Sequence, residues 1–459
     1  MPDRPRDPSA RSFLGPVGEG PVGFSPARTP LRGSVRVPGD KSVSHRAVLL
    51  GAVSSGPVSV TGFLRSADTL AGVAAVRALG VEVEEEGTKL LVDGSGWDGL
   101  QEPENVLDVG NSGTLIRLLP GLLASVPHLV VLTGDASIRR RPMSRITEPL
   151  RRMGVSIRGR GGGRFAPLVV QGGSIQAIEH RMEVSSAQVK SCLLLAGLRA
   201  LGQTTVFDPG VSRDHTERML RYGGVGVETE PVGPGQRVSV SPVQELRLGP
   251  IAVPGDPSSA AFLLAAGALV PGSEVTVTGV GLNPTRTGFL RILERMGVPL
   301  EIRDWPVKGP EPLGDVTVHG PEGLLPVDIG PEEVPGLIDE LPIWALVAAR
   351  AEGVSRLHGA GELRVKESDR LSGMSTLLRD IGVRVAETED GLQIIGNSRR
   401  WPGGLVRSLA DHRLAMVGAV AGLCSEEGVT VDDASCMAVS FPGFSSTIES
   451  LRTDEGEDS

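Results

Sequence analysis

The chain contains two copies of a Pro-Gly-Asp-x-Ser segment, and the difference between them points to chemistry. The first copy reads PGDKSVSHR and the second reads PGDPSSAAF. Both keep a serine suited to the start of a helix, so this shared frame is structural. Only the first copy carries Lys41 and Arg46, where the second has Pro257 and Phe262. Because a requirement of the fold would appear in both copies, the two cations indicate anion binding. The alternative is a pair of solvated surface charges.

Other predicted helix starts also carry polar side chains where apolar ones would serve a helix equally well. They are GNSGT followed by Arg117, SSAQ around Ser186, the pair Asp339-Glu340, and the run Asp411-His412-Arg413. Helix N-termini present free N–H groups and a partial positive charge, which favour bound phosphate and carboxylate. If these helix starts face one cleft, an acidic protein gains a locally cationic pocket for small polyanions.

Two charged stretches belong with this set. RVKESDR places Lys366, Glu367 and Arg370 at the start of a helix, with the two cations four residues apart on one face. An ordinary surface ion pair is the alternative, but a glutamate beside two cations could serve as a proton donor. In the run RRRP, Arg141 is the candidate for anion binding, and the two arginines before it are expected to be exposed charges.

These residues are positioned by a repeated unit, a helix of small and apolar residues followed by a strand, an amphipathic helix and a strand opening with Gly-Val. The first helices of the units are predicted to begin near Lys41, Ser112, Ser186, Pro257, Asp339 and Asp411, at intervals of 71, 74, 71, 82 and 72 residues. The second helices have apolar residues at three- and four-residue spacing and end at a glycine that can adopt the left-handed conformation. Those recognised begin near Asp68, Met143, Arg286 and Glu367.

The repeat predicts two domains of three units each, with the active site in the cleft between them. Residues 25–40 plus 246–459 are assigned to domain I and residues 41–245 to domain II, and the strand before Pro38 is expected to cross into the other half. Residues 1–24 are predicted to be a disordered extension, as is the C-terminal RTDEGEDS. The two cleft walls are expected to be alike in charge and to repel each other when the cleft is empty.

Bulk composition excludes several classes of protein. The net charge of −9 and the single tyrosine argue against nucleic-acid binding. The three cysteines lie apart without metal-ligand spacing, which argues against a zinc site and for a reducing compartment; Cys192 is expected to be a buried, inert thiol. The N-terminus lacks the apolar stretch of a signal peptide, and the longest apolar segment is too short to span a membrane. The sequence therefore predicts a cytoplasmic protein with no nucleic-acid or membrane partner.

Seven motifs in order resemble those of the 5-enolpyruvylshikimate-3-phosphate synthase family. They are PGDKSVSHR, GNSGT, RRRP, SSAQVKS, IDELP, RVKESDRL and DHRLAM, and they cover nearly all of the chain from Pro38 onward. Each motif alone is weak, but the ordered set is specific. The resemblance implies a two-domain inside-out α/β barrel whose domains each hold three βαβαββ units, in agreement with the repeat.

The resemblance also implies an activity, the transfer of the enolpyruvyl group of phosphoenolpyruvate to the 5-hydroxyl of shikimate 3-phosphate. Addition would give a tetrahedral intermediate and elimination would release phosphate, with no metal or organic cofactor. Asp339 would be the base, and Glu367 with Lys41 the candidate proton donors. A monomer is expected.

By the same resemblance, two groups of residues would hold the substrates. Those for shikimate 3-phosphate are Lys41, Ser42, Arg46, Ser186, Gln188, Ser212, Asp339 and Lys366. Those for phosphoenolpyruvate are Lys41, Asn111, Gly113, Arg141, Gln188, Arg370 and Arg413. Arginine suits this work because its planar fork donates two hydrogen bonds to one carboxylate or phosphate.

The chain departs from the family pattern at two positions. Ala187 stands where many members have a second serine, and Val439 stands where many have a lysine near the C-terminus. One phosphate contact and one cation for phosphoenolpyruvate are therefore absent or supplied elsewhere. Gly113 matches the position that discriminates against glyphosate, the phosphonate that competes with phosphoenolpyruvate in this family, and on that residue alone the enzyme is expected to be sensitive.

Two alternative functions stay open on the sequence. A related enolpyruvyl transferase acts on UDP-N-acetylglucosamine, but it typically has Lys-Asn where this chain has Lys41-Ser42, and a cysteine in a loop that here reads GDASIRRRP. An inactive homologue that only binds an anion is the second alternative. The presence of Lys41, Asp339 and Glu367 together argues against it.

Overall fold

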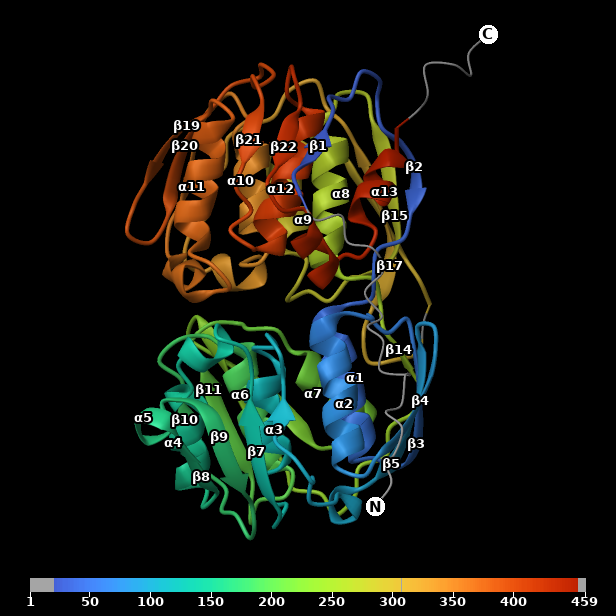
Figure 1. Ribbon diagram of the computed structural model, residues 1–459, viewed down its shortest axis with the longest axis vertical. Coiled ribbons are helices and arrows are strands. Elements are labelled where there is room, and N and C mark those ends of the chain that lie inside the picture. Colours follow the sequence, from blue (N-terminus) through green and yellow to red (C-terminus); the bar gives the residue numbers. More distant parts are fainter. Residues whose placement is uncertain (1–19, 307, 453–459) are drawn as a thin grey trace, which may run out of the picture.

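The computed structural model describes residues 20–306 and 308–452, which form two domains stacked along the long axis of the molecule (Figure 1). Each domain is built from three similar units of strands and helices. In a complete unit the first strand pairs parallel to the second, and the third and fourth strands follow in antiparallel pairing. The two-domain α/β fold and the six units predicted from the repeat are therefore confirmed.

Domain II, drawn in blue and green in Figure 1, contains three four-stranded sheets. The strands of its first sheet are β14 (Ile251–Ala252), β3 (Ser55–Thr61), β5 (Lys89–Ser95) and β4 (Glu82–Glu86). Those of its second are β6 (Leu107–Asp108), β7 (Leu129–Thr133), β9 (Phe165–Gln171) and β8 (Ser156–Gly159). Those of its third are β10 (Glu179–Arg181), β11 (Thr204–Asp208), β13 (Gly235–Val240) and β12 (Val227–Val232).

Domain I repeats this plan with one four-stranded and two three-stranded sheets. Its first sheet contains β2 (Arg32–Val35), β15 (Glu274–Gly281), β17 (Leu313–His319) and β16 (Leu300–Asp304). Its second contains β18 (Gly353–Leu357), β20 (Leu392–Gly396) and β19 (Arg384–Glu387). Its third contains β21 (Gly404–Val406), β22 (Val429–Val431) and β1 (Val22–Phe24). Because β2 pairs with β15, the expected crossing of the strand before Pro38 into the other half is confirmed.

The first helix of every unit runs through a domain interior. These helices are α1 (Lys41–Ala52), α3 (Leu115–Leu122), α6 (Ala187–Gly197), α8 (Pro257–Leu269), α10 (Leu341–Ala348) and α12 (His412–Leu423). Nearly all of their residues are buried, which explains why their sequences are small and apolar on all sides. Because each helix is enclosed along its length, mainly its first turn can reach the cleft.

The second helices lie outside the first and bury one face. They are α2 (Ala67–Ala78), α4 (Ser144–Arg152), α7 (His215–Tyr222), α9 (Gly288–Arg295) and α11 (Arg370–Asp380). Most of their charged residues face solvent, as the amphipathic period predicts, and the buried exceptions are Asp68, Glu217 and Arg370. The remaining helices are short: α5 (Arg160–Gly163), α13 (Phe444–Glu449), η1 (Trp97–Gly99), η2 (Ile138–Arg140), η3 (Val334–Gly336), η4 (Gly361–Val365) and η5 (Ser435–Val439).

The domain boundary lies later in the chain than Glu245. Leu246, Leu248 and Ile251 are buried in the core of domain II, and β14 pairs parallel to β3. The chain therefore crosses to domain I at residues 254–256, next to its first crossing at residues 38–40. The physical reason is that β14 supplies the first strand of the unit that α1 opens, just as β2 does for the unit that α8 opens.

Part of the predicted N-terminal extension is ordered. Residues 1–19 and 453–459 lie outside the described residues, but β1 pairs antiparallel to β22 and Phe24 is buried. This short strand completes the three-stranded sheet of the last unit. Neither its length nor its local sequence predicts that pairing. Among the described residues, no helix is both long and apolar enough to cross a membrane.

Candidate active site

The starts of five of the six buried helices, all except α8, meet a cavity between the two domains. Of the residues predicted from the sequence, those that line it are Lys41, Ser42, Gly113, Arg141, Ser186, Gln188, Asp339, Lys366, Glu367, Arg370 and Arg413. An adjoining cavity shares several of these residues and adds Ala187 and Ser212. Residues more than 370 positions apart in the sequence are thus brought to one cleft, as the converging helix starts predict.

Lys41 is the first residue of α1 and is held by Asp68 at the start of α2. The Lys41 amine lies 3.1 Å from a carboxylate oxygen of Asp68. Burial by itself would lower the pKa of Lys41, but Asp68 and then Glu367 outweigh it and raise that pKa. Lys41 is therefore a protonated amine in the empty cleft, suited to an anion.

Gly113 lies against two arginine side chains. A Cβ on Gly113 would be 2.6 Å from Arg141 Nη1 and 3.1 Å from Arg117 Nη1. The φ of Gly113 is not in the left-handed range, so its backbone does not require glycine. Asn111 does not line the cavity, but its side-chain oxygen accepts a hydrogen bond from Arg141 at 3.2 Å.

The serines on the other side of domain II share one buried carboxylate. Ser212 donates from its hydroxyl to Asp208 at 2.5 Å, and Ser185 donates to the second oxygen of Asp208. Ser186 caps α6 by accepting from the N–H of Val189. A phosphate at this position would have to compete with Asp208 for the Ser212 proton.

Arg46 lies behind the wall of the cleft. Its guanidinium is buried and donates to the Ser42 carbonyl at 3.0 Å, to Thr216 at 2.7 Å and to Ser191 at 2.8 Å. Burial lowers the pKa of Arg46 to about 10. The structure therefore shows Arg46 supporting the first turn of α1, and its contact with a substrate stays a prediction.

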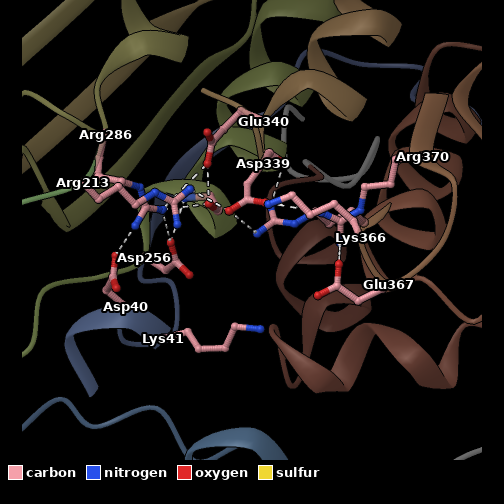
Figure 2. A network of polar contacts seen from close by, with 12 residues as sticks. Asp40, Lys41, Arg213, Asp256, Arg286, Asp339, Glu340, Lys366, Glu367 and Arg370 are labelled. Carbon is pink, nitrogen blue, oxygen red and sulfur yellow. Dashed lines mark hydrogen bonds and ion pairs between the residues drawn. The ribbon is translucent and has the colours of Figure 1, made fainter. Parts of the chain in front are cut away.

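Asp339 stands before α10 with four cations around its side chain (Figure 2). Nitrogen–oxygen distances are 2.6 Å to Arg213, 3.3 Å to Arg370, 3.8 Å to Lys366 and 3.8 Å to Arg413. Burial favours the neutral acid, but the four cations dominate and hold the pKa of Asp339 well below its usual range. Asp339 is a carboxylate in the empty cleft.

Glu367 is a second carboxylate on the domain I wall. It lies 2.7 Å from Arg370 and 3.9 Å from Arg141 of the opposite domain. Burial works against its ionisation, but Arg370, Lys41 and Arg141 together hold the pKa of Glu367 well below its usual range. Its protonation as a general acid therefore requires that these cations be neutralised.

Ion pairs join the two walls of the cleft, although the walls were expected to be alike in charge. Arg213 pairs with Asp339, Arg145 with Glu362 at 2.9 Å, and Arg141 approaches Glu367. Each arginine belongs to domain II and each carboxylate to domain I. The expectation counted the cations of both walls and left out the carboxylates of domain I that face the arginines of domain II.

Several lining residues were given no substrate-binding or catalytic role from the sequence. They are Asp68, Arg117, Arg145, Arg213, Glu362 and His412. Arg213 had a usable signal, since it directly follows Ser212 in GVSRDH, and His412 lies inside the DHR run. Arg145 and Glu362 had none, because each becomes part of the site through its partner on the other domain.

Cys192 is fully buried, as expected, and burial raises the pKa of its thiol to about 12. Within residues 20–306 and 308–452, no group of three or more His, Cys, Asp or Glu side chains is arranged to hold a metal ion.

Comparison with known proteins agrees with the resemblance seen in the motifs. The family model of EPSP synthase (3-phosphoshikimate 1-carboxyvinyltransferase) matches residues 26–448. A 3-phosphoshikimate 1-carboxyvinyltransferase of Geobacter sulfurreducens is 48% identical over 426 residues, which are 93% of this chain and 98% of that protein. One of Alkaliphilus metalliredigens is 46% identical over 421 residues, 92% of this chain and 97% of that protein.

Solved structures give the same result. The EPSP synthase of Acinetobacter baumannii is 40% identical, with a TM-score of 0.85 over 94% of this chain and 98% of that one. The enolpyruvyl transferase NikO of Streptomyces tendae shares the fold, with a TM-score of 0.73 at 20% identity. The chain therefore belongs to the EPSP synthase (3-phosphoshikimate 1-carboxyvinyltransferase) family.

Proposed function

We propose that this protein transfers the enolpyruvyl group of phosphoenolpyruvate to the 5-hydroxyl of shikimate 3-phosphate and releases phosphate, in the pathway to chorismate and the aromatic amino acids. The observation that carries the proposal is the cleft itself, where cations from both domains surround Asp339 and Glu367 in a chain of this family. Two anionic substrates fit a site that collects positive charge within an otherwise acidic protein.

In the addition step, the 5-hydroxyl oxygen bonds to C2 of phosphoenolpyruvate while C3 gains a proton. Asp339 takes the hydroxyl proton, and Glu367 or Lys41 supplies the proton to C3. In the elimination step, C3 returns a proton, the double bond re-forms and the bond from C2 to the phosphate oxygen breaks. Phosphate is already a good leaving group, so the chemistry calls for no metal or organic cofactor.

The substrates would be held by groups from both walls. Lys41, Arg141, Arg370 and Arg413 are proposed to meet the carboxylate and phosphate of phosphoenolpyruvate, because all four line the cleft beside Glu367 or Asp339. Arginine forks and a lysine point charge both suit these anions. The residues proposed for shikimate 3-phosphate lie on the domain II side together with Lys366 and Asp339 of domain I.

The charges of the empty cleft bear on the proton donor. Glu367 is ionised there, whereas Lys41 is already protonated. Bound anions on Arg141 and Arg370 would offset the positive field at Glu367, and its pKa would rise. Substrate binding itself would then convert Glu367 from a base into an acid.

A phosphate-release assay tests the proposal against its alternatives. The purified chain is given phosphoenolpyruvate with shikimate 3-phosphate, phosphoenolpyruvate with UDP-N-acetylglucosamine, or phosphoenolpyruvate alone. Phosphate release only in the first mixture supports the proposal. Release only with the nucleotide sugar would establish the related transferase, and no release in any mixture would indicate an inactive homologue.

We further propose that the enzyme acts as a cytoplasmic monomer on its two small anionic substrates. The net charge of −9 supports the absence of a nucleic-acid partner. Light scattering on the eluate of a sizing column should give the mass of one chain, and the mass of two chains would contradict the monomer.

A further inference from the structure

The two chain crossings between the domains are paired with each other. Gly39 and Gly255 form an antiparallel bridge, the N–H of Asp40 donates to Pro254 at 2.8 Å, and the N–H of Asp256 donates to Pro38 at 2.9 Å. The two crossings pack closely, because a Cβ on Gly255 would lie 2.8 Å from Val37 Cγ2 of the first crossing. The two Pro-Gly-Asp segments therefore make one two-stranded hinge.

The side chain of Arg286 joins both strands of this hinge (Figure 2). Its Nη1 lies 2.7 Å from Asp40, and its Nη2 lies 3.0 Å from Asp256 and 2.8 Å from the Ser258 hydroxyl. The same Nη2 is 3.8 Å from Glu340. All five side chains are almost completely buried, so solvent does little to screen these contacts.

The carboxylates bound by Arg286 fix the helices that carry the candidate catalytic residues. Asp40 caps α1 by accepting from the Val43 N–H at 2.9 Å, and Lys41 is the next residue. Asp256 caps α8 in the same way through Ser258. Glu340 directly follows Asp339 and precedes α10. One guanidinium thus reaches the neighbours of Lys41 in domain II and of Asp339 in domain I.

The other half of the molecule shows that the fold does not require this arginine. Counted back from the Gly-Val pairs that end α2 and α9, at Gly80 and Gly297, the position equivalent to Arg286 is Thr69. Thr69 hydrogen-bonds only within its own loop, to Leu64 and Ser66. The repeated unit therefore forms without a cation at this position.

We propose that Arg286 is a positioning residue that fixes the hinge and thereby sets Lys41 of domain II in register with Asp339 of domain I. The inference rests on the proposed function of those two residues. The planar guanidinium directs separate N–H groups to Asp40 and to Asp256, which a single lysine amine cannot do from one point. A shift of about 1 Å between reacting groups can cost a hundredfold in rate.

The test compares Arg286→Lys with the wild type in steady-state kinetics, thermal unfolding and small-angle scattering. Turnover should fall by about 10²-fold, while the Michaelis constant of each substrate changes by less than about threefold. The radius of gyration without ligand should be larger than that of the wild type, because the hinge is no longer fixed. Arg291→Lys is the matched control, since Arg291 lies on α9, the helix that follows Arg286, is exposed and contacts Thr287.

A purely structural role would lower the melting temperature and leave turnover unchanged at temperatures where the variant is folded. A folded Arg286→Lys protein with turnover within about twofold of the wild type and an unchanged scattering curve therefore overturns the inference. If Arg286→Lys does not fold, Asp40→Asn is used instead, because its oxygen can keep the α1 cap to Val43 while its amide nitrogen replaces the oxygen that Arg286 contacts. Turnover should then fall by about tenfold, and unchanged turnover in that variant overturns the inference equally.

The inference can also fail separately from the proposed function. A wild type that releases no phosphate contradicts the proposed function, but the ligand-free scattering comparison does not depend on turnover. A larger radius of gyration in Arg286→Lys would still support the hinge contact, and an unchanged radius would refute it.

Discussion

The two halves of the molecule share one architecture but divide the chemistry between them. The first turn of α1 presents Lys41 and Ser42 to the cleft, whereas the matching turn of α8 begins with Pro257 and lies in the interior of domain I. Domain II contributes cations such as Arg141 and Arg213, and domain I contributes both Asp339 and Glu367. A repeated fold has thus become an asymmetric site through side chains at helix starts.

The comparison also shows where a difference between repeats misleads. Arg46 and Phe262 occupy matching positions, and the structure buries both. Phe262 packs edge-on against Phe444, while Arg46 is held by hydroxyls of its own domain. A charge present in only one copy therefore indicates the cleft when it lies in the first turn of the helix. One turn further along the helix, such a charge can instead be buried and hydrogen-bonded within its own domain.

Replacing Asp339, the proposed base on domain I, should have the largest effect on turnover. In Asp339→Asn the side chain keeps its size but cannot take the hydroxyl proton, so turnover should fall by about 10²–10⁴ with substrate affinity within roughly tenfold. Steady-state kinetics and equilibrium binding of shikimate 3-phosphate measure the two effects. Asp328→Asn is the control, because Asp328 is an exposed partner of Arg356 in the same domain. Near-wild-type turnover in Asp339→Asn would remove Asp339 from the role of base.

Gly113→Ala should weaken the binding of glyphosate more than that of phosphoenolpyruvate, because it changes the surface beside the cations of domain II. The added methyl would press on Arg141, and glyphosate is longer than phosphoenolpyruvate, so its inhibition constant should rise more than the Michaelis constant. An added methyl can discriminate by about 10–200-fold. In Gly173→Ala a Cβ meets open space, so neither constant should change.

The wild type provides the counter-test for this glycine. Activity unaffected by millimolar glyphosate at low phosphoenolpyruvate would contradict the sensitivity inferred from Gly113, and would implicate Ala187 or Val439. Ala187 lines the adjoining cavity. Val439 is not among the residues that line the two cleft cavities.

Proton uptake on substrate binding should report how strongly the cations of the two walls hold Glu367 ionised. Glu367 has a lowered pKa in the empty cleft, and bound anions would raise it, so binding at pH 6–7 should take up protons, with less uptake as the pH rises. Titration calorimetry in buffers of different ionisation enthalpy measures this uptake. Burial and the neighbouring Arg413 lower the pKa of His412 to about 3. Bound anions would raise this pKa for the same reason, and the variant Glu367→Gln separates proton uptake by Glu367 from uptake by His412. The coupling of anion binding to protonation of Glu367 would be contradicted if the binding enthalpy did not depend on the buffer, or if that dependence were the same in Glu367→Gln.

The sequence predicted the fold and most of the cleft because the units repeat and because helix starts are local features. The six first helices begin within about three residues of their predicted positions. The reason is that a run of small apolar residues after a polar capping residue predicts the start of a buried helix. Motifs such as RVKESDR carry their function within a few residues, so Lys366, Glu367 and Arg370 could be placed together.

What the sequence did not predict depends on contacts between distant segments. Strand β1 is recognisable only through its pairing with β22, more than 400 residues later. Arg213 gains its role from Asp339, and the two are separated by 126 positions with no shared motif. The late domain boundary has the same cause, because β14 is a two-residue strand identified by its neighbour β3.

The smallest expected effect concerns the ion pair that joins the walls outside the proposed substrate contacts. Arg145 and Glu362 are 2.9 Å apart and partly exposed, and such pairs contribute about 0.2–1 kcal/mol, or a factor of about 1.4 to 5 in an equilibrium. Because the pair can form only when the cleft is closed, Arg145→Met or Glu362→Gln should raise both Michaelis constants by that factor and leave turnover within about twofold. A double-mutant cycle isolates the pair, and added salt should abolish the difference. Michaelis constants that fall in Arg145→Met would instead mean that the ion pair obstructs substrate entry and that closure relies on the hinge and the substrates alone.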